Sequence, residues 1–172
     1  MLFRSKEQKL LFKLKHGMCK DRLALSLVLG TLGGKRLLEY TKQLTEINNE
    51  EFTHPLEINV CVGKNEKVRR SILRWFIDEG SQVLKETDKY TTVETKNGVV
   101  FHLRKFTKEL IEILICSHLV ITKTGSCSVN EAIYLGKKLL LDNTTASSAR
   151  HLFWETFNLH FVRDRKSTRL NS

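Results

Sequence analysis

The chain has 172 residues, of which 41% are hydrophobic, with one proline and nine glycines. This length and composition suit one domain with a buried core and exclude a low-complexity or disordered chain. The formal net charge is +10, but residues 1–22 hold seven basic and two acidic residues, and residues 163–172 hold four basic and one acidic. A nucleic-acid groove needs positive charge on the folded body, so we expect no nucleic-acid partner.

The two ends of the chain differ in pattern from its middle. Residues 1–22 are interpreted as a basic leader or interdomain linker, and residues 163–172 as a non-native tail that takes no part in the fold. We expect no membrane span, because no apolar run reaches about 18 residues. The predicted location is cytoplasmic, with peripheral contact between the basic ends and acidic lipid at the inner face of the membrane.

From residue 23 onward, apolar runs of strand length alternate with amphipathic segments of helix length. Strands are expected at 23–30, 56–63, 99–103, 119–122, 138–142 and 159–162, and helices at 35–47, 66–77, 107–116, 128–135 and 147–157. The polar, Thr-rich residues 80–98 are expected to form a loop or an irregular edge strand. Apolar runs without alternation indicate strands buried on both faces. The sequence therefore predicts an α/β fold with a doubly wound parallel sheet of Rossmann-like type over residues 23–162.

Ligands of such sheets bind beyond the carboxyl ends of the strands. The segments that follow the expected strands here are glycine-rich or polar: Gly33-Gly34, Gly63-Lys64-Asn65, Arg104-Lys105-Phe106 and Thr124-Gly125-Ser126. Lys64, Arg104 and Lys105 could neutralise a phosphate. Two familiar nucleotide motifs are excluded, because residues 30–36 miss the P-loop spacing and no G-x-G-x-x-G follows the first strand.

The segment from Val120 to Ala132 runs from an apolar strand through a turn of glycine and small hydroxyl residues into a helix. The free backbone N–H groups at such a helix start favour a phosphate. Ser128 and Glu131 also match a capping box, which needs no ligand. A carboxylate at Glu131 could instead accept hydrogen bonds from a ribose diol, so both interpretations stay open.

No catalytic centre or metal site emerges from the sequence. The four cysteines, Cys19, Cys61, Cys116 and Cys127, lie far apart without a C-x-x-C pair, so neither zinc nor a disulfide framework is expected. The histidines have no catalytic partner at a recognisable spacing, and the catalytic residues therefore stay unassigned.

Three segments, residues 29–34, 60–65 and 119–132, resemble the C-terminal half of GT-B glycosyltransferases. The resemblance is closest to the group of the lipid II-forming N-acetylglucosaminyltransferase and the monogalactosyldiacylglycerol synthases. It implies a Rossmann-like domain that binds a UDP-sugar as substrate, without a cofactor or a tightly bound metal.

The resemblance also implies roles for individual residues. Glu131 would hold the ribose hydroxyls, and the turn before it would bind the diphosphate. Arg104 to Phe106 would line the uracil, partly through the main chain. The complete implied donor-binding set is Gly33, Gly34, Asn65, Arg104, Lys105, Phe106, Thr124, Gly125, Ser126, Cys127, Ser128 and Glu131.

The chain departs from this family in residues 143–155, which lack the family's Gln-rich sugar-reading segment. Arg150, His151 and Glu155 are candidates for sugar contacts in its place. The family's acceptor-binding N-terminal domain is absent, so we expect a fragment of a hexosyltransferase with a membrane lipid-type acceptor, inactive in isolation. Two alternatives stay open: a separate donor-binding subunit of a two-chain glycosyltransferase, or half of a sugar-nucleotide epimerase.

Overall fold

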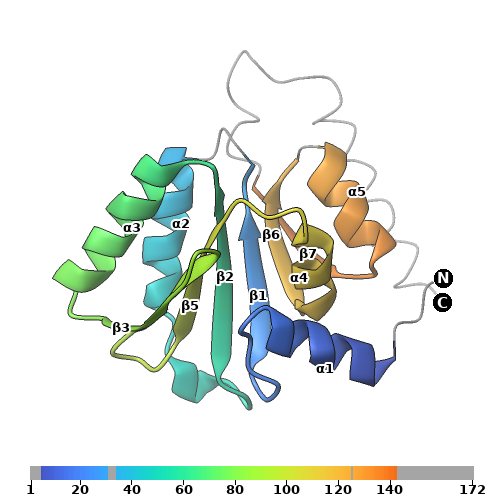
Figure 1. Cartoon of the computed structure of the whole chain (residues 1–172), viewed down its shortest axis with the longest axis horizontal. Coiled ribbons are helices and arrows are strands. Elements are labelled where there is room, and N and C mark those ends of the chain that lie inside the picture. Colours follow the sequence, from blue (N-terminus) through green and yellow to red (C-terminus); the bar gives the residue numbers. More distant parts are fainter. Residues whose placement is uncertain (1–4, 31–33, 125, 143–172) are drawn as a thin grey trace.

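The computed structural model describes residues 5–30, 34–124 and 126–142, which form a sheet covered by helices on both faces (Figure 1). The strands are β1 (Leu23–Val28), β2 (Leu56–Gly63), β3 (Gln82–Glu86), β4 (Tyr90–Glu94), β5 (Val100–Lys105), β6 (Leu119–Lys123) and β7 (Lys138–Asp142). The helices are α1 (Lys6–Lys15), α2 (Gly34–Thr45), α3 (Glu66–Asp78), α4 (Leu110–Cys116) and α5 (Ser126–Tyr134), with a 3-10 turn at Asn49–Glu51.

The strand order in this part of the chain is β3-β4-β5-β2-β1-β6-β7. Neighbouring strands from β5 to β7 pair in parallel, and the chain begins in the middle of the sheet at β1 before building outward in both directions. Helices α2 and α3 cover one face, whereas α1, α4 and α5 lie on the other (Figure 1). The predicted doubly wound α/β fold is thereby confirmed.

The face under α2 and α3 is aliphatic and aromatic. Alternate residues of the central strands point to this side and are fully buried, including Leu27, Ile58 and Phe101. Phe76 of α3 packs on Phe101 with ring centroids 5.0 Å apart. Burial of this apolar surface is the main driving force that holds α2 and α3 on the sheet.

The opposite face of the same strands carries polar side chains under α1. Glu57, Asn59, His102 and Arg104 are each at most 3% exposed. The His102 Nδ1 atom lies 3.0 Å from the Thr92 hydroxyl, and burial lowers the pKa of His102 despite the nearby Glu57 carboxylate. Buried polar groups of this kind must find partners inside the protein, and α1 with the segment after it supplies several of them.

Residues 1–22 were expected to be a leader or linker outside the domain, and this boundary differs in the structure. Helix α1 packs against α4, with Phe12 in a small cluster that also contains Met18, Ala24 and Cys116. The buried Lys13 ammonium donates hydrogen bonds to the carbonyls of Cys19, Lys20 and Arg22, and it lies 3.8 Å from a Glu57 oxygen. The described part of the leader is therefore part of the folded domain.

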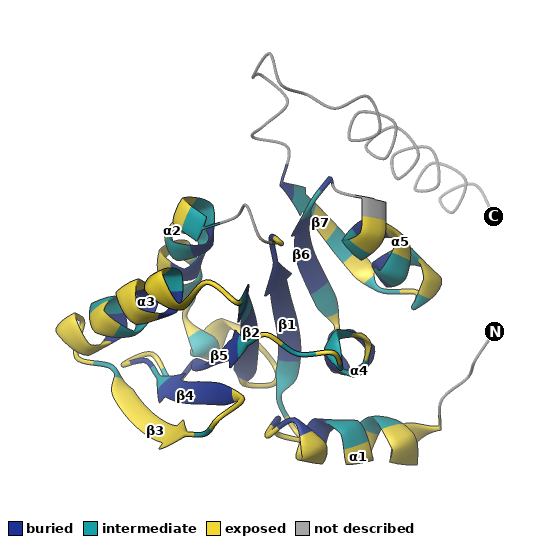
Figure 2. Cartoon of the chain, turned by 45° about the horizontal axis from the view of Figure 1, so that its top comes forward, coloured by how far each residue is buried: buried dark blue, intermediate teal, exposed yellow. Residues whose placement is uncertain are grey.

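Residues 80–98 form more regular structure than the sequence indicated. Strands β3 and β4 make an antiparallel hairpin, and β4 pairs antiparallel with β5. Every residue of β3 is exposed, whereas Tyr90 to Val93 of β4 are buried (Figure 2). The aromatic and β-branched residues of β4 fit a half-buried pleated surface, which explains the strand in a segment otherwise rich in polar residues.

Two helices begin at other positions than expected. Helix α4 starts at Leu110 rather than Thr107, and the Thr107 hydroxyl accepts a hydrogen bond from the Glu109 N–H just before the helix. Helix α5 starts at Ser126, two residues before the expected start. The helix expected at 147–157, the strand expected at 159–162 and the tail expected at 163–172 lie outside the described residues. Within the described residues, no helix is both long and apolar enough to cross a bilayer.

Replacement of Lys13 by Met should destabilise the protein by about 3–5 kcal/mol, because Glu57 would keep a buried charge without its cation. The free energy of unfolding in urea measures this loss. Lys20→Met, at an exposed lysine on the same segment, is the matched control and should change stability by less than about 0.5 kcal/mol. Equal unfolding midpoints for both variants would mean that α1 does not belong to the cooperative fold.

Candidate functional site

A cleft of about 790 Å³ opens at the carboxyl ends of β1, β2 and β5. Its position agrees with the general rule that ligands of open parallel sheets bind beyond the strand ends. The described residues that line it are Val28, Gly30, Cys61, Val62, Gly63, Lys64, Asn65, Glu66, Lys67, Lys105, Phe106, Thr107 and Leu110.

The cleft combines an apolar interior with a cationic rim. Side chains such as Val28, Val62 and Leu110 supply apolar lining, and Lys64, Lys67 and Lys105 supply positive charge. The Phe106 side chain is 57% exposed, and the Lys64 ammonium lies 4.8 Å from the centre of its ring. An open aromatic ring beside cations can accept a planar, electron-rich group together with an attached anion.

Two cleft residues with reactive side-chain types are unsuited to catalysis as the structure holds them. Burial raises the pKa of the Cys61 thiol to about 11, so this group is neutral at pH 7 and is not a nucleophile. Hydrogen bonds from Arg69 lower the pKa of Glu66 to about 2, and this is the one carboxylate among the described cleft-lining residues. A carboxylate so firmly ionised is a poor general base.

The segment Arg104-Lys105-Phe106 is divided between the two faces of the sheet. Lys105 and Phe106 line the cleft, whereas the Arg104 side chain points to the opposite face and does not. Its guanidinium donates hydrogen bonds to the Asn59 side-chain oxygen at 2.6 Å and to the His16 carbonyl at 2.8 Å. Alternation along β5 places Arg104 on the face opposite Leu103, so its predicted side-chain contact with a ligand was wrong.

The glycines and the asparagine predicted at the pocket border have different surroundings. Asn65 lines the cleft and also caps α3, because its side-chain oxygen accepts a hydrogen bond from the Val68 N–H. Gly34 is not among the cleft-lining residues but lies beside α3, where an added Cβ would come within 3.1 Å of Val68 Cγ2. Gly33 lies outside the described residues.

The end of β6 lies beside the cleft, although Lys123 and Thr124 are not among the described residues that line it. Strands β1 and β6 pair with Val28 opposite Thr122, so the carboxyl ends of these two strands are neighbours. Lys123 approaches the cleft from this side, since its Cε lies 3.7 Å from the position of a Cβ added to Gly30. The cleft and the start of α5 therefore share one edge of the sheet.

The remaining residues predicted to bind the donor lie on or near α5. Thr124 is buried, Cys127 is exposed, and Ser128 and Glu131 are half-buried within the helix. Because α5 starts at Ser126, Ser128 is not the residue that precedes the helix, and the capping-box interpretation was wrong. Gly125 and the three candidates for sugar contacts, Arg150, His151 and Glu155, lie outside the described residues.

Sequence reasoning missed Arg36 and the apolar lining of the cleft. Arg36 in the first turn of α2 forms an ion pair of 3.1 Å with the buried Asp142 at the end of β7. This ion pair connects α2 with β7, two elements that are far apart in the sequence. The sequence predicted Leu110 only as part of a helix, but in the structure this residue lines the cleft. No local motif marks these residues, because their position depends on the order of strands in the sheet.

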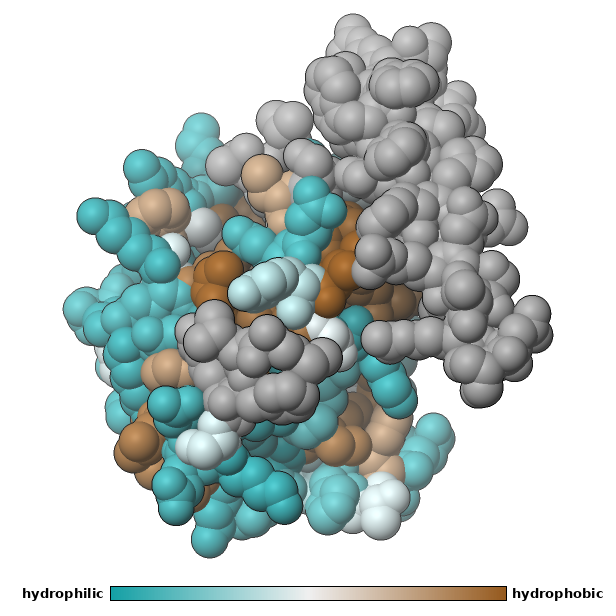
Figure 3. All heavy atoms as spheres, turned by 90° about the vertical axis from the view of Figure 1, so that its right-hand side faces the viewer, coloured by the Kyte–Doolittle hydropathy of each residue, from teal (hydrophilic) through white to brown (hydrophobic). Residues whose placement is uncertain are grey.

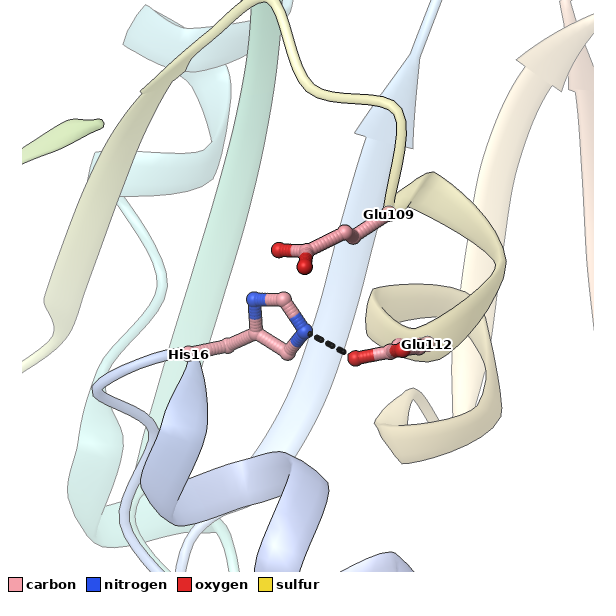
Figure 4. Close-up of side chains that lie close together, drawn as sticks. All are labelled: His16, Glu109 and Glu112. Atoms are coloured by element: carbon pink, nitrogen blue, oxygen red, sulfur yellow. Dashed lines mark hydrogen bonds and ion pairs between the residues drawn. The ribbon is translucent and has the colours of Figure 1, made fainter.

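A second polar cluster lies between α1 and α4, where His16, Glu109 and Glu112 point toward one another (Figure 4). The His16 Nε2 atom lies 2.8 Å from a Glu112 oxygen. These residue types can bind a metal, but the Lys15 ammonium already lies 2.9 Å from Glu109 and 2.8 Å from Glu112. Its hydrogen bonds lower the pKa of both carboxyls, and we interpret the cluster as a structural contact between the two helices.

No protein-family model and no curated protein sequence matches the chain. Among solved structures, that of EarP, described as the basis for EarP-mediated arginine glycosylation of translation elongation factor EF-P, matches with a TM-score of 0.53 at 15% identity. The match covers 80% of this chain and 41% of EarP, so the chain spans about two-fifths of the length of that protein. The chain has a GT-B glycosyltransferase-like fold.

Two further solved structures match more weakly. E. coli ADP-heptose LPS heptosyltransferase II has a TM-score of 0.49 at 14% identity, over 82% of this chain and 38% of that one. The NMR structure of ALG13 has a TM-score of 0.47 at 18% identity, over 70% of this chain and 65% of that one. The likeness to EarP concerns the fold alone.

Replacement of Arg104 by Met should lower stability by about 1–3 kcal/mol for each buried acceptor that loses its donor, namely the Asn59 oxygen and the His16 carbonyl. Urea unfolding monitored by circular dichroism measures the change. Lys105→Met, at the next residue but on the cleft side, should alter stability by less than about 0.5 kcal/mol. If Arg104→Met unfolds at the same urea concentration as the unmodified chain, Arg104 does not have this structural role.

Proposed function

We propose that this chain is the donor-binding domain of a glycosyltransferase, that it binds a UDP-sugar in the cleft, and that the whole enzyme transfers a hexose to a lipid-type acceptor. The observation that carries the proposal is the combination of the Phe106 ring with Lys64 and Lys105 at the strand ends of a GT-B-like fold. The likeness to EarP supports the fold, and the sequence resemblance supports the choice of UDP-sugar and of a lipid acceptor.

The nucleotide would extend from the cleft toward α5. Its base would stack on Phe106 at the end of β5, where the apolar lining excludes water. The ribose and diphosphate would lie toward the turn after β6, within reach of Lys123, the first backbone N–H groups of α5 and the Glu131 carboxylate. Lys123 and the N–H groups of the helix would stabilise the negative charge that develops on the departing diphosphate, whereas Glu131 would accept hydrogen bonds from the ribose.

Activation of the acceptor requires a group from outside the described cleft. Glu66 is held by Arg69 and Cys61 is a neutral thiol, so neither can remove the acceptor proton at pH 7. The chain also spans only 41% of EarP. We therefore propose that this chain binds the donor but does not turn over without a further domain or partner.

Replacement of Phe106 by Ala should weaken UDP binding about tenfold, because base–aromatic stacking contributes about 1–3 kcal/mol. Isothermal titration calorimetry with UDP, and with ADP and GDP for comparison, measures the affinity. Phe52→Ala removes a 40% exposed ring remote from the cleft and should leave affinity unchanged. No detectable UDP binding by the unmodified chain, or equal affinity for all three nucleotides, would contradict the proposed donor.

Replacement of Glu131 by Ala should weaken UDP binding by about 1.5–3 kcal/mol if its carboxylate accepts the ribose hydroxyls. The matched variant is Asn130→Ala, at the exposed preceding residue of the same helix, which should bind UDP normally. 2′,3′-Dideoxy-UDP should bind the unmodified chain and Glu131→Ala with similar affinity, because neither complex has the ribose contact. If Glu131→Ala binds UDP as tightly as the parent chain, the carboxylate does not contact the ligand.

A further inference from the structure

Helix α1 is attached to the domain mainly through polar contacts. Lys13 is the only buried one of its ten residues, whereas α4 buries four of its seven. The Phe12 side chain adds a small apolar contact. Figure 3 views the side of the molecule on which α1, α4 and α5 lie, and hydrophilic and apolar side chains are interspersed on it. A surface helix that buries so little apolar area can separate from a domain that otherwise stays folded.

The segment after α1 covers polar side chains of the sheet. Arg104 donates a hydrogen bond to the His16 carbonyl at 2.8 Å, and one Glu57 oxygen accepts a hydrogen bond from the Cys19 N–H at 2.9 Å. The other Glu57 oxygen accepts no hydrogen bond from any described residue and lies 3.8 Å from the Lys13 ammonium. We call residues 6–22 the α1 cover. Water can replace each of these contacts when the α1 cover moves away from the sheet.

The His102 imidazole lies under the α1 cover and is 2% exposed. Its Nδ1 atom lies 3.0 Å from the Thr92 hydroxyl, and its Nε2 atom lies 3.5 Å from the Glu57 oxygen that the Cys19 N–H already contacts. The Tyr90 ring meets the imidazole edge-on, with ring centroids 5.8 Å apart. These neighbours separate the imidazole from water while the cover is closed.

The charges around His102 make a further positive charge unfavourable. The charged and titratable side chains of the surrounding elements are Lys13, His16, Arg22, Glu57, Glu94 and Arg104. Arg22 and Glu94 form an ion pair of 3.7 Å at the partly exposed rim. Among the described residues, this leaves the buried Glu57 carboxylate beside two buried cations, Lys13 and Arg104. A proton on His102 would add a third positive charge to this cluster, away from water.

We propose that acidification opens the α1 cover through proton uptake by His102. In the closed form, burial outweighs the Glu57 carboxylate and holds the pKa of His102 below its ordinary value, so the ring is neutral at pH 7. In the open form, water reaches the ring, which regains an ordinary pKa of about 6.5. Below about pH 6.5 the open form therefore binds a proton that the closed form excludes. Opening becomes more favourable by up to about tenfold per pH unit, until the lowered pKa of the closed form is reached. This inference does not depend on the proposed sugar-nucleotide function.

The other titratable groups near the α1 cover do not produce this effect. Hydrogen bonds from Lys15 lower the pKa of Glu109 and of Glu112, so both carboxylates stay ionised at pH 5.5 and continue to hold α1. A proton on His16 would strengthen its contact with Glu112 and oppose opening. Burial also lowers the pKa of His118, but this ring accepts its hydrogen bond from the backbone of β1 and not from the cover.

Amide hydrogen exchange of the whole chain at pH 7.5 and 5.5, corrected for the intrinsic exchange rates, tests the proposal. Protection of residues 6–15 should be about tenfold lower at pH 5.5, whereas protection of α3 should not change. His102→Gln should remove the pH dependence, because glutamine does not titrate in this range. The matched control His54→Gln, at an exposed histidine, should leave the pH dependence as it is.

A second pair of variants opens the α1 cover without acid. Gly17 has a φ of +68°, and a Cβ added there would overlap the Tyr90 hydroxyl, so Gly17→Ala should displace the cover at neutral pH. Titration followed by NMR should then give His102 a pKa closer to its ordinary value than in the unmodified chain. Gly136→Ala is the control, because Gly136 also has a positive φ but no atom lies within 4 Å of an added Cβ.

Circular dichroism at both pH values establishes that each variant is folded, and the NMR titration decides if His102→Gln is not. Equal protection of α1 at the two pH values, or an equal loss of protection in α3, would overturn the proposal. So would a pH dependence that persists in His102→Gln, or one that disappears in His118→Gln. The same pKa for His102 in Gly17→Ala and in the unmodified chain would also contradict it.

Discussion

The position of Glu57 constrains much of the domain. This carboxylate lies in the central strand β2 and is 1% exposed, in a place where a lone charge would not be tolerated. Lys13 supplies the nearby cation, and the Cys19 N–H donates a hydrogen bond to Glu57. The partners come from α1 and from the segment that leads into β1, so one buried acid in the sheet fixes the path of the chain before the sheet begins.

The fold was predictable because short segments rich in apolar residues, of strand length, alternate along the chain with amphipathic segments of helix length. The predicted residues of β2, 56–63, agree with the structure, and α3 differs from the prediction by one residue at its end. The position of two lysines at this edge of the sheet was predictable as well, since Lys64 directly follows β2 and Lys105 ends β5. Both results follow from local sequence, in which periodicity and the end of a run identify an element without knowledge of its neighbours.

The features that could not be predicted depend on contacts between segments that are far apart in the sequence. Arg104 looks like a ligand-binding cation in sequence, and only the polar face formed by Asn59 and the His16 carbonyl shows that it is structural. Similarly, α1 resembles a charged leader until its pairing with Glu57 is known. The apolar lining of the cleft could not be predicted residue by residue, because it requires the order of β1, β2 and β5 and the position of α4 beside them.

The placement of α1 bears on how an acceptor would be presented. The loop that Lys13 holds leads into the amino end of β1, whereas the cleft lies at the carboxyl ends of the strands, so the helix and the cleft occupy opposite ends of the sheet (Figure 1). A strand of eight residues such as β2 spans about 26 Å. An acceptor held beside α1 would have to extend over a comparable distance, or be passed on by another domain, to meet a donor in the cleft.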